Sequence, residues 1–175
     1  MKTHRVITII GWLVSGILLF LWQEKYLPFH YEYIEQFRLF HYSADYFIEH
    51  CSYPSGIIEY LGSFLIQFFN QPHVGAGIVT ILLLSVGIGI QQIFKRIASH
   101  VDMPLAYLLP TLFLLFAGMD INYHLEGTLA FALSVWFLNI QVSFVRPVHR
   151  MISGVLLSWA LYYLAGPAFA LFALC

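Results

Sequence analysis

Charged side chains are scarce in this chain. Lys, Arg, Asp and Glu make up 10% of its 175 residues, whereas hydrophobic residues make up 60%. A typical soluble domain is about 25% charged. So few charges cannot cover a water-facing surface, and the bilayer must therefore form part of the solvent. The net charge of −1 argues against nucleic acid as a partner, because phosphate binding requires clustered Lys and Arg.

Several chemical signatures are also missing. Cys51 and Cys175 do not make a disulfide framework. The sequence contains no Walker loop, no His-Glu-x-x-His motif, no nucleophile elbow and no cysteine pair with metal-ligand spacing. No ionisable residue lies at the centre of an apolar run, which weighs against an ion-coupled transporter. The sequence therefore predicts no metal centre, and the cofactor is unknown.

Long apolar runs are what the chain does have. Each run is about 17–18 residues, the low end of what a roughly 30 Å hydrocarbon core requires. Five of them predict transmembrane helices, at residues 6–22, 74–90, 103–119, 127–144 and 148–165. The first follows Lys2 and Arg5 like a signal peptide, but no small-x-small cleavage site follows it, which favours an uncleaved signal anchor. A further apolar run reaches Cys175, so we expect an N-terminal fragment of a longer protein.

Acidic and basic residues occupy different segments between these runs. Eight of the nine acidic residues lie in 23–73 and 119–126, and six of the eight Lys and Arg lie in the other connecting segments. Lys25, Arg38 and Asp102 are the exceptions. Because Lys and Arg stay on the cytoplasmic side, the pattern predicts an N-terminus on the cytoplasmic side of the membrane. Residues 23–73 and 119–126 would then lie outside.

Residues 23–73 are unusually aromatic for a loop, with 14 aromatic residues among 51. Apolar positions recur at helical spacing over 31–49 and again over 57–69, with a turn signal at 51–56 between them. The second stretch is too short to span a bilayer. The expected fold is therefore an all-α polytopic membrane protein forming a single membrane domain over 1–175. It would have about five transmembrane helices and two interfacial amphipathic helices in this extracytoplasmic loop.

Glu32 and Glu35 are the first candidates for chemistry, because carboxylates at i and i+3 share a helix face. Held near a membrane among aromatic side chains, Glu35 could act as a general base. The alternative, which the composition favours, is solvated charge on an amphipathic helix with an ordinary Glu35–Arg38 pair.

Two further sets of polar residues are candidates for binding a metal, a substrate or a lipid. His41, Asp45 and Glu49 follow at i, i+4 and i+8 and could bind a divalent cation, but three polar residues on a wet helical stripe are expected anyway. Asp120, His124 and Glu126 lie in the second acidic segment, where they could meet the acids of the first and contact a substrate or lipid. A polar turn that keeps helix ends wet is the simpler interpretation.

The first acidic segment also carries a resemblance. Residues 31–40 and 45–47, Tyr53-Pro-Ser-Gly56, Glu59-Tyr-Leu-Gly62, 67–69, Pro72 and Gly75-Ala76 resemble the start of a family of uncharacterised bacterial polytopic membrane proteins. The match covers about residues 25–80. Members of that family are much longer, which agrees with a fragment, and they have no settled function.

The order of elements bears a looser resemblance to the GT-C superfamily of integral-membrane glycosyltransferases. Those enzymes use an outer-loop carboxylate as base and a polyprenyl-phosphate sugar as donor. The resemblance implies Glu32 or Glu35 as the base, although no Asp-Asp or Asp-Glu pair follows the first run. We expect Glu35 to be the base, with Glu32, Asp45 and Asp120 placing the substrate or a metal. A non-catalytic membrane scaffold is the first alternative and a transporter fragment the second. The expected partners are the bilayer and a lipid-linked sugar.

Overall fold

The computed structural model describes residues 2–37, 39–97, 107–120 and 122–173. In that part of the chain every element is a helix. The elements are α1 (Lys2–Tyr26), α2 (Pro28–Gln36), α3 (Ala44–Cys51), α4 (Gly56–Ile66), η1 (Gln67–Asn70), α5 (Pro72–Ile97), α6 (Leu108–Ala117), α7 (Leu125–Ser143), α8 (Pro147–Ala165), η2 (Gly166–Ala168) and α9 (Phe169–Ala173). The prediction of an all-α protein is confirmed.

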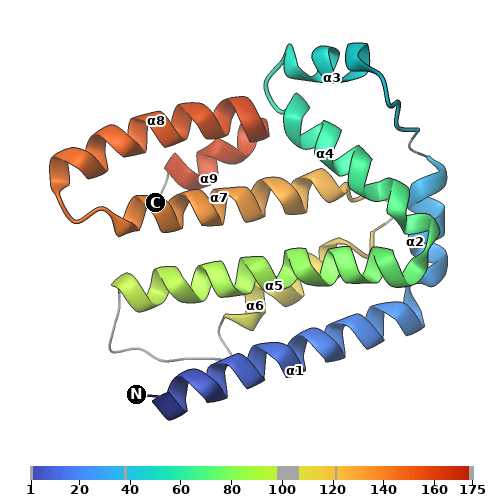
Figure 1. Cartoon of the computed structure of the whole chain (residues 1–175), viewed down its shortest axis with the longest axis horizontal. Coiled ribbons are helices and arrows are strands. Elements are labelled where there is room, and N and C mark those ends of the chain that lie inside the picture. The colour runs from blue at the N-terminus through green and yellow to red at the C-terminus, as the bar shows by residue number, and fades with distance from the viewer. Residues whose placement is uncertain (1, 38, 98–106, 121, 174–175) are drawn as a thin grey trace.

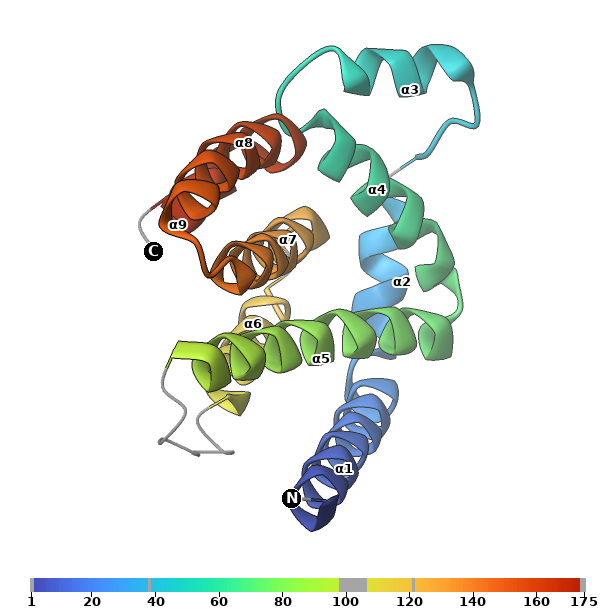
Figure 2. The same ribbon diagram turned by 60° about the vertical axis from the view of Figure 1, so that its left-hand side comes forward.

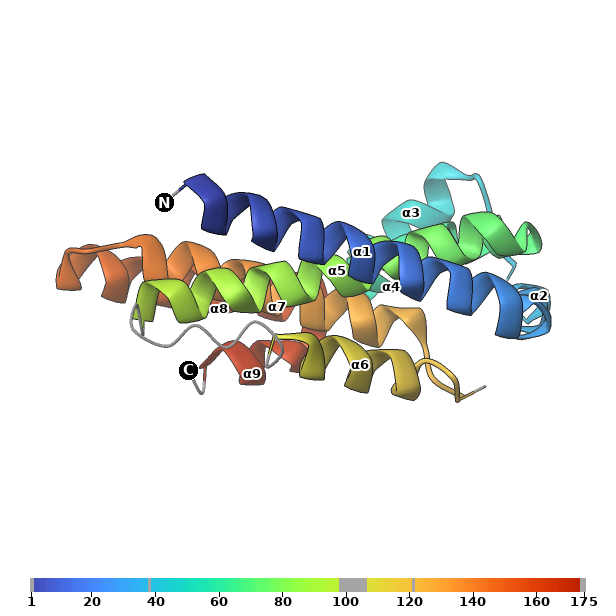
Figure 3. The same cartoon turned by 90° about the horizontal axis from the view of Figure 1, so that it is seen from below.

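The long helices pack side by side around α5. Helix α5 contacts α1 on one side and α7 on the other, α8 packs on α7, and α6 lies against α5 (Figure 1). The central core joins α5, α6 and α7 through apolar side chains such as Leu83, Leu114 and Val135. Helix α1 lies at the margin of the bundle (Figure 3) and exposes most of its apolar side chains.

Polar side chains cross between the long helices at a few points. The Gln23 amide donates to the Thr80 hydroxyl at 2.8 Å, joining α1 to α5. The Asn139 amide donates to the Gly89 carbonyl at 2.7 Å, joining α7 to α5. Hydrogen bonds of this kind hold helices together where the surrounding apolar medium offers no competing water.

Four helical segments are long and apolar enough to cross a bilayer: Val6–Tyr26, Pro72–Ile97, Leu125–Ser143 and Pro147–Ala173. These long apolar helices indicate a membrane protein and agree with four of the five predicted spans. The run predicted at 103–119 appears as the ten-residue helix α6, and residues 103–106 lie outside the described part of the chain. A fifth span is therefore not confirmed. At Gly166 the chain turns back, so that α9 packs against α7 and α8 (Figure 1).

The expected single helix over 31–49 is wrong. Helix α2 ends at Gln36 and α3 begins at Ala44, with Arg38 outside the described residues. The Ser43 hydroxyl accepts a hydrogen bond from the Tyr46 amide at 3.2 Å and starts a new helix. The non-helical residues before Ser43 let Phe40 reach α4, where its ring lies 4.9 Å from that of Tyr60. The loop therefore holds three helices rather than two.

The second helix expected in this loop, over 57–69, is confirmed as α4 followed by η1. Helix α4 crosses the end of the bundle and contacts α7 and α8, whereas α3 packs on α4 at the outer edge (Figure 2).

The acidic segments gather at one end of the bundle. Helices α2, α3 and α4 and the turn between α6 and α7 lie toward the right of Figure 1, and the break between α8 and α9 lies at the right-hand end of α8, facing them. The start of α1, the end of α5 and the connection between α7 and α8 lie at the opposite end, with Lys95, Arg96 and Arg146. We call these the acidic end and the basic end. The separation agrees with the charge pattern of the sequence, except that Asp102 lies outside the described residues.

Candidate functional site

An open cavity of about 340 Å³ lies at the acidic end, between α4, the start of α7 and the break between α8 and α9. Most of its lining is apolar, from residues such as Ile58 and Ala130. Its polar lining comes from Ser55, Glu59, Tyr123 and Glu126. Two carboxylates from distant parts of the chain therefore share one apolar cavity, which we call the carboxylate cavity.

Glu126 is the buried member of this pair, with 8% of its surface exposed. It lies in the first turn of α7, where the positive end of the helix dipole favours a carboxylate. Its side chain packs onto Gly62 of α4: a Cβ atom at position 62 would lie 2.7 Å from Glu126 Cγ and 2.9 Å from Cδ. Only glycine at position 62 leaves room for the carboxylate as it stands.

Glu59 lies one helical turn before Gly62 on α4. Its two oxygens accept hydrogen bonds from the Ser55 hydroxyl at 2.6 Å and the Tyr53 hydroxyl at 3.0 Å. Burial, the hydrogen bond to Glu59 and the nearby negative charges raise the pKa of Tyr53 to about 12. Tyr53 therefore stays protonated at neutral pH and remains a donor to Glu59.

The turn that carries Ser55 is fixed to the break after α8. Ser55 has a left-handed backbone, with φ of 74°, and its amide donates to the Tyr163 carbonyl at 3.1 Å. Gly166 is also left-handed, with φ of 56°, and a Cβ there would lie 2.9 Å from Ser55 Cβ. Glycine at position 166 thus allows both the chain reversal and the close approach that forms this wall of the carboxylate cavity.

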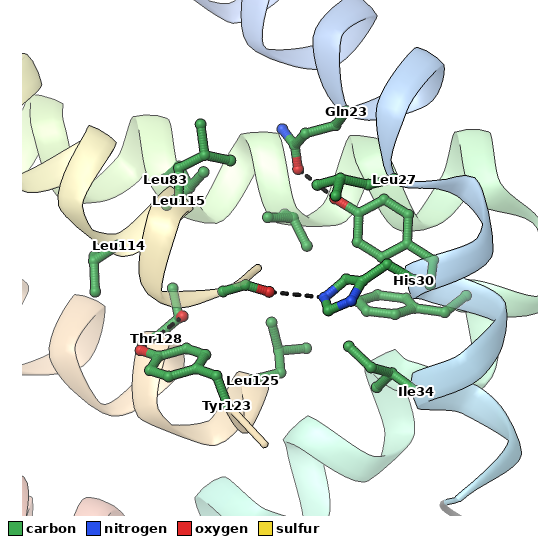
Figure 4. Close-up of a pocket in the computed structure, with 14 residues that line it drawn as sticks. Gln23, Leu27, His30, Ile34, Leu83, Leu114, Leu115, Tyr123, Leu125 and Thr128 are labelled. Atoms are coloured by element: carbon green, nitrogen blue, oxygen red, sulfur yellow. Dashed lines mark hydrogen bonds between the residues drawn. The ribbon is translucent and has the colours of Figure 1, made fainter. Parts of the chain in front are cut away.

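A second, smaller cavity of about 40 Å³ lies beside the first, between α2, α5 and the turn before α7 (Figure 4). It has room for one or two water molecules. The His30 ring donates to the Gly118 carbonyl at 2.8 Å, and the Tyr31 hydroxyl donates to Gln23 (Figure 4). Burial raises the pKa of Tyr31 above its usual value. Tyr123 and Leu114 line both cavities.

The structure brings all six predicted site residues to the acidic end but places them differently. Glu32 on α2 and Asp45 on α3 are exposed, and Glu35 is half-buried. Asp120 and His124 are exposed in the turn before α7, where Asp120 Oδ1 accepts from the Asn122 amide at 2.9 Å. Of the six, Glu126 is the one that lines the carboxylate cavity.

The predicted stripe of His41, Asp45 and Glu49 is not helical throughout. His41 precedes α3, so it does not continue the face that Asp45 and Glu49 share. Among the described residues, no group of three or more His, Cys, Asp or Glu side chains is arranged to hold a metal ion.

Sequence reasoning missed Glu59, Gly62 and Tyr53. Glu59 was counted as one acid among eight and given no role. One signal could have singled it out: it is the sole charged residue of the apolar helix α4, with a glycine one turn later on the same face. What it faces across the cavity could not be read from the sequence.

Comparison with known proteins identifies the family to which this chain belongs. Residues 3–175 match DUF6057, a family of unknown function, and the chain belongs to it. The match confirms a family without an assigned function, over more of the chain than the expected residues 25–80. No curated protein and no solved structure is similar enough to match.

Proposed function

We propose that this chain is the membrane part of an enzyme that transfers a sugar from a lipid-linked donor, and that the reaction takes place at the acidic end. The observation that supports this proposal most is the carboxylate cavity, which joins Glu59 from the first loop to Glu126 at the start of a later helix. An apolar cavity with a few convergent polar groups is the usual form of a small-molecule site.

The order of elements gives a weaker reason. One long apolar helix is followed by a loop of short helices at the end of the bundle and then by further apolar helices, as in the GT-C superfamily. This is analogy at the level of the fold, and a fold does not determine a function. The sugar and its lipid carrier are not specified by it.

The chemistry requires one carboxylate in reach of the acceptor. As the acceptor oxygen bonds to the anomeric carbon, its proton passes to the carboxylate, and the donor phosphate leaves with the electrons of the broken bond. Glu126 and Glu59 both line a cavity that could hold the acceptor, whereas Glu32 is exposed on α2. Glu126 is our first choice of base, because it is the more deeply buried of the two carboxylates that line this apolar cavity.

The test compares charge-removing variants in native membranes, with sugar transfer from polyprenyl-phosphate donors as the readout. Glu126→Gln should lower transfer by about 10²–10⁴-fold, the usual contribution of a general base. Glu49→Gln, which changes an exposed acid of α3, is the matched control and should leave transfer unchanged. Expression and membrane insertion of each variant are measured in parallel.

Glu35→Gln belongs in the same experiment, since Glu35 is the base that the sequence resemblance implies. Loss of transfer in this variant but not in Glu126→Gln would move the base to α2. Unchanged transfer in Glu126→Gln, Glu59→Gln and Glu35→Gln together would overturn the proposed reaction.

A non-catalytic scaffold is the second candidate, and a specific observation favours it. Helix α2 and the residues after it expose large apolar side chains, including Phe29 at 83% and Leu39 at 83%. Such a surface suits the membrane interface or a partner helix. Phe29→Ser with Leu39→Ser should then release a co-purifying partner, whereas Glu126→Gln should not. Phe64 is a poor choice for this test because its ring packs 5.5 Å from that of Phe40.

A further inference from the structure

Two apolar grooves run along opposite sides of α1. One lies between α1 and α6, has a volume of about 670 Å³ and is lined by Trp22. The other lies between α1 and α5, has a volume of about 630 Å³ and is lined by Trp12. Both fall within the roughly 300–1,000 Å³ of small-molecule sites. We call them the α6-side groove and the α5-side groove.

The α6-side groove has the length of one lipid leaflet. Its lining on α1 extends from Ser15 to Tyr26, which at 1.5 Å per residue is about 16 Å along the helix. That is about half of a roughly 30 Å hydrocarbon core. The groove is lined mainly by apolar side chains of the two helices, such as Leu18 and Leu112. A hydrocarbon chain standing parallel to α1 would fit this shape.

A basic residue stands at the end of this groove. Lys25 lines it and is exposed, with Nζ 5.3 Å from the centre of the Tyr26 ring. Lys25 and Arg38 are the two basic residues of the 23–73 segment, which holds six acids. The neighbouring carboxylate, Glu24, accepts a hydrogen bond from His73 on α5 at 3.2 Å. It is thereby directed toward α5, and Lys25 is left at the mouth of the groove.

The two grooves differ in the charge of the side chains that line them. The α5-side groove extends from Thr8 to Leu21 on α1, and its polar lining includes Thr80 and Gln91. It offers an apolar surface of similar size, and none of the described side chains that line it is acidic or basic. Comparing lipid binding in the two grooves therefore measures the contribution of the Lys25 ammonium group.

We infer that the α6-side groove binds an anionic phospholipid of the leaflet at the acidic end, with one hydrocarbon chain between α1 and α6 and the lipid phosphate at Lys25. The apolar lining matches the chain, and the ammonium group matches the phosphate. This site requires only that the bundle spans a membrane. It is independent of the proposed sugar transfer, because lipid binding is measured without any reaction.

Tryptophan quenching can test the site, since each groove contains one tryptophan. Two single-tryptophan forms of the whole chain would keep Trp22 or Trp12, with the other tryptophans changed to Phe. Each is reconstituted in phosphatidylcholine mixed with brominated phosphatidylglycerol or brominated phosphatidylcholine. We expect Trp22 to be quenched by both lipids, with about a fivefold preference for the anionic one. Trp12 should be quenched equally by both.

Charge-removing variants then identify the source of the preference. Lys25→Gln should abolish the anionic preference at Trp22, and Lys25→Arg should keep it. Lys95→Gln is the control, because Lys95 is exposed at the basic end. The inference is overturned if Trp22 shows no preference, or if the preference survives Lys25→Gln.

Two other outcomes would also overturn the inference. Failure of either brominated lipid to quench Trp22 would mean that protein, such as a second copy of the chain, fills the groove. Loss of the preference on adding millimolar inorganic phosphate would mean that Lys25 binds the free anion rather than a lipid.

Discussion

The two ends of this bundle are built from the same long helices but differ in what closes them. At the basic end, α7 and α8 are joined by a few exposed residues, with Val145 at 95% exposure. The acidic end carries three extra helices and a chain reversal, and two of these helices, α2 and α4, line cavities there, one of which holds a buried carboxylate. A connection between spans needs only a few residues. The described part of the acidic end therefore holds more structure than a short connection requires, and the carboxylate cavity lies there.

The contrast between the acidic end and the basic end would lose its meaning if both ends faced the same compartment, so this test has the largest expected effect. In a form with Cys51 and Cys175 changed to Ser, we would place single cysteines at Tyr42 and Val145, which are 80% and 95% exposed. A membrane-impermeant maleimide should label Tyr42→Cys in intact cells whose outer membrane is permeable, and Val145→Cys only after lysis. Equal labelling of both in intact cells would show that the bundle does not span the membrane as predicted.

The next test concerns the close contact between α4 and α7 at the acidic end. Gly62→Ala adds a methyl group where Glu126 already packs, with 2.7 Å between the new Cβ and Glu126 Cγ. Overpacking of this kind should lower the free energy of unfolding by about 1–3 kcal/mol. Thermal unfolding in detergent measures the change.

Gly77→Ala is the matched control on α5. The nearest side-chain atom to a Cβ there, on Phe20, lies 3.9 Å away. Since alanine is the better helix former by up to about 1 kcal/mol, this variant should be neutral or slightly stabilising. Equal destabilisation by both changes would mean that the α4–α7 contact at Gly62 is no tighter than the α1–α5 contact at Gly77.

A smaller effect is expected at the outer edge of the acidic end. Ser43→Ala removes the hydroxyl that accepts from the Tyr46 amide and should destabilise α3 by about 1 kcal/mol. Faster amide hydrogen exchange in α3, with α5 unchanged, would report the loss. Ser153→Ala at the basic end is the control, because Ser153 is inside α8 and does not cap a helix. Unchanged exchange in α3 would indicate that packing on α4 alone holds this helix.

The sequence predicted the long helices and the separation of charges because both depend on local properties. Apolar runs of sufficient length favour long helices wherever they pack, and residues 74–90 and 127–144 do form such helices. The break between α2 and α3 was missed because Phe37, Phe40 and Phe47 continue the helical spacing across it. The deciding contact, Phe40 on Tyr60, joins residues on different elements and has no local signature.

The candidate site was predicted only in part for the same reason. The acidic end was found from the charge pattern, and Glu126 was among the residues named. Which acids share a cavity depends on how α4 crosses α7, and this crossing is set by Gly62 and by the turn at Ser55 and Gly166. Periodicity places a side chain on a face of its own helix, but it does not identify the helix opposite.

The smallest expected effect is the ionisation of one tyrosine at the acidic end, Tyr53. Tyr53 donates to Glu59 and has its pKa raised from 10.0 to about 12 by burial and by the neighbouring carboxylates. Because the folded pKa exceeds the unfolded one, the folded state binds more protons between pH 10 and 12. Stability should therefore be fully present below about pH 10 and fall as the pH rises toward 12.

The phenolate absorbance of the protein minus that of Tyr53→Phe isolates this titration, and its midpoint should lie near pH 12. Adding Glu59→Gln should lower the midpoint, because a neutral partner no longer repels the phenolate, while the burial of Tyr53 keeps part of the shift. A midpoint near the ordinary 10.0 in the unaltered protein would contradict the hydrogen bond that holds Glu59 at the cavity.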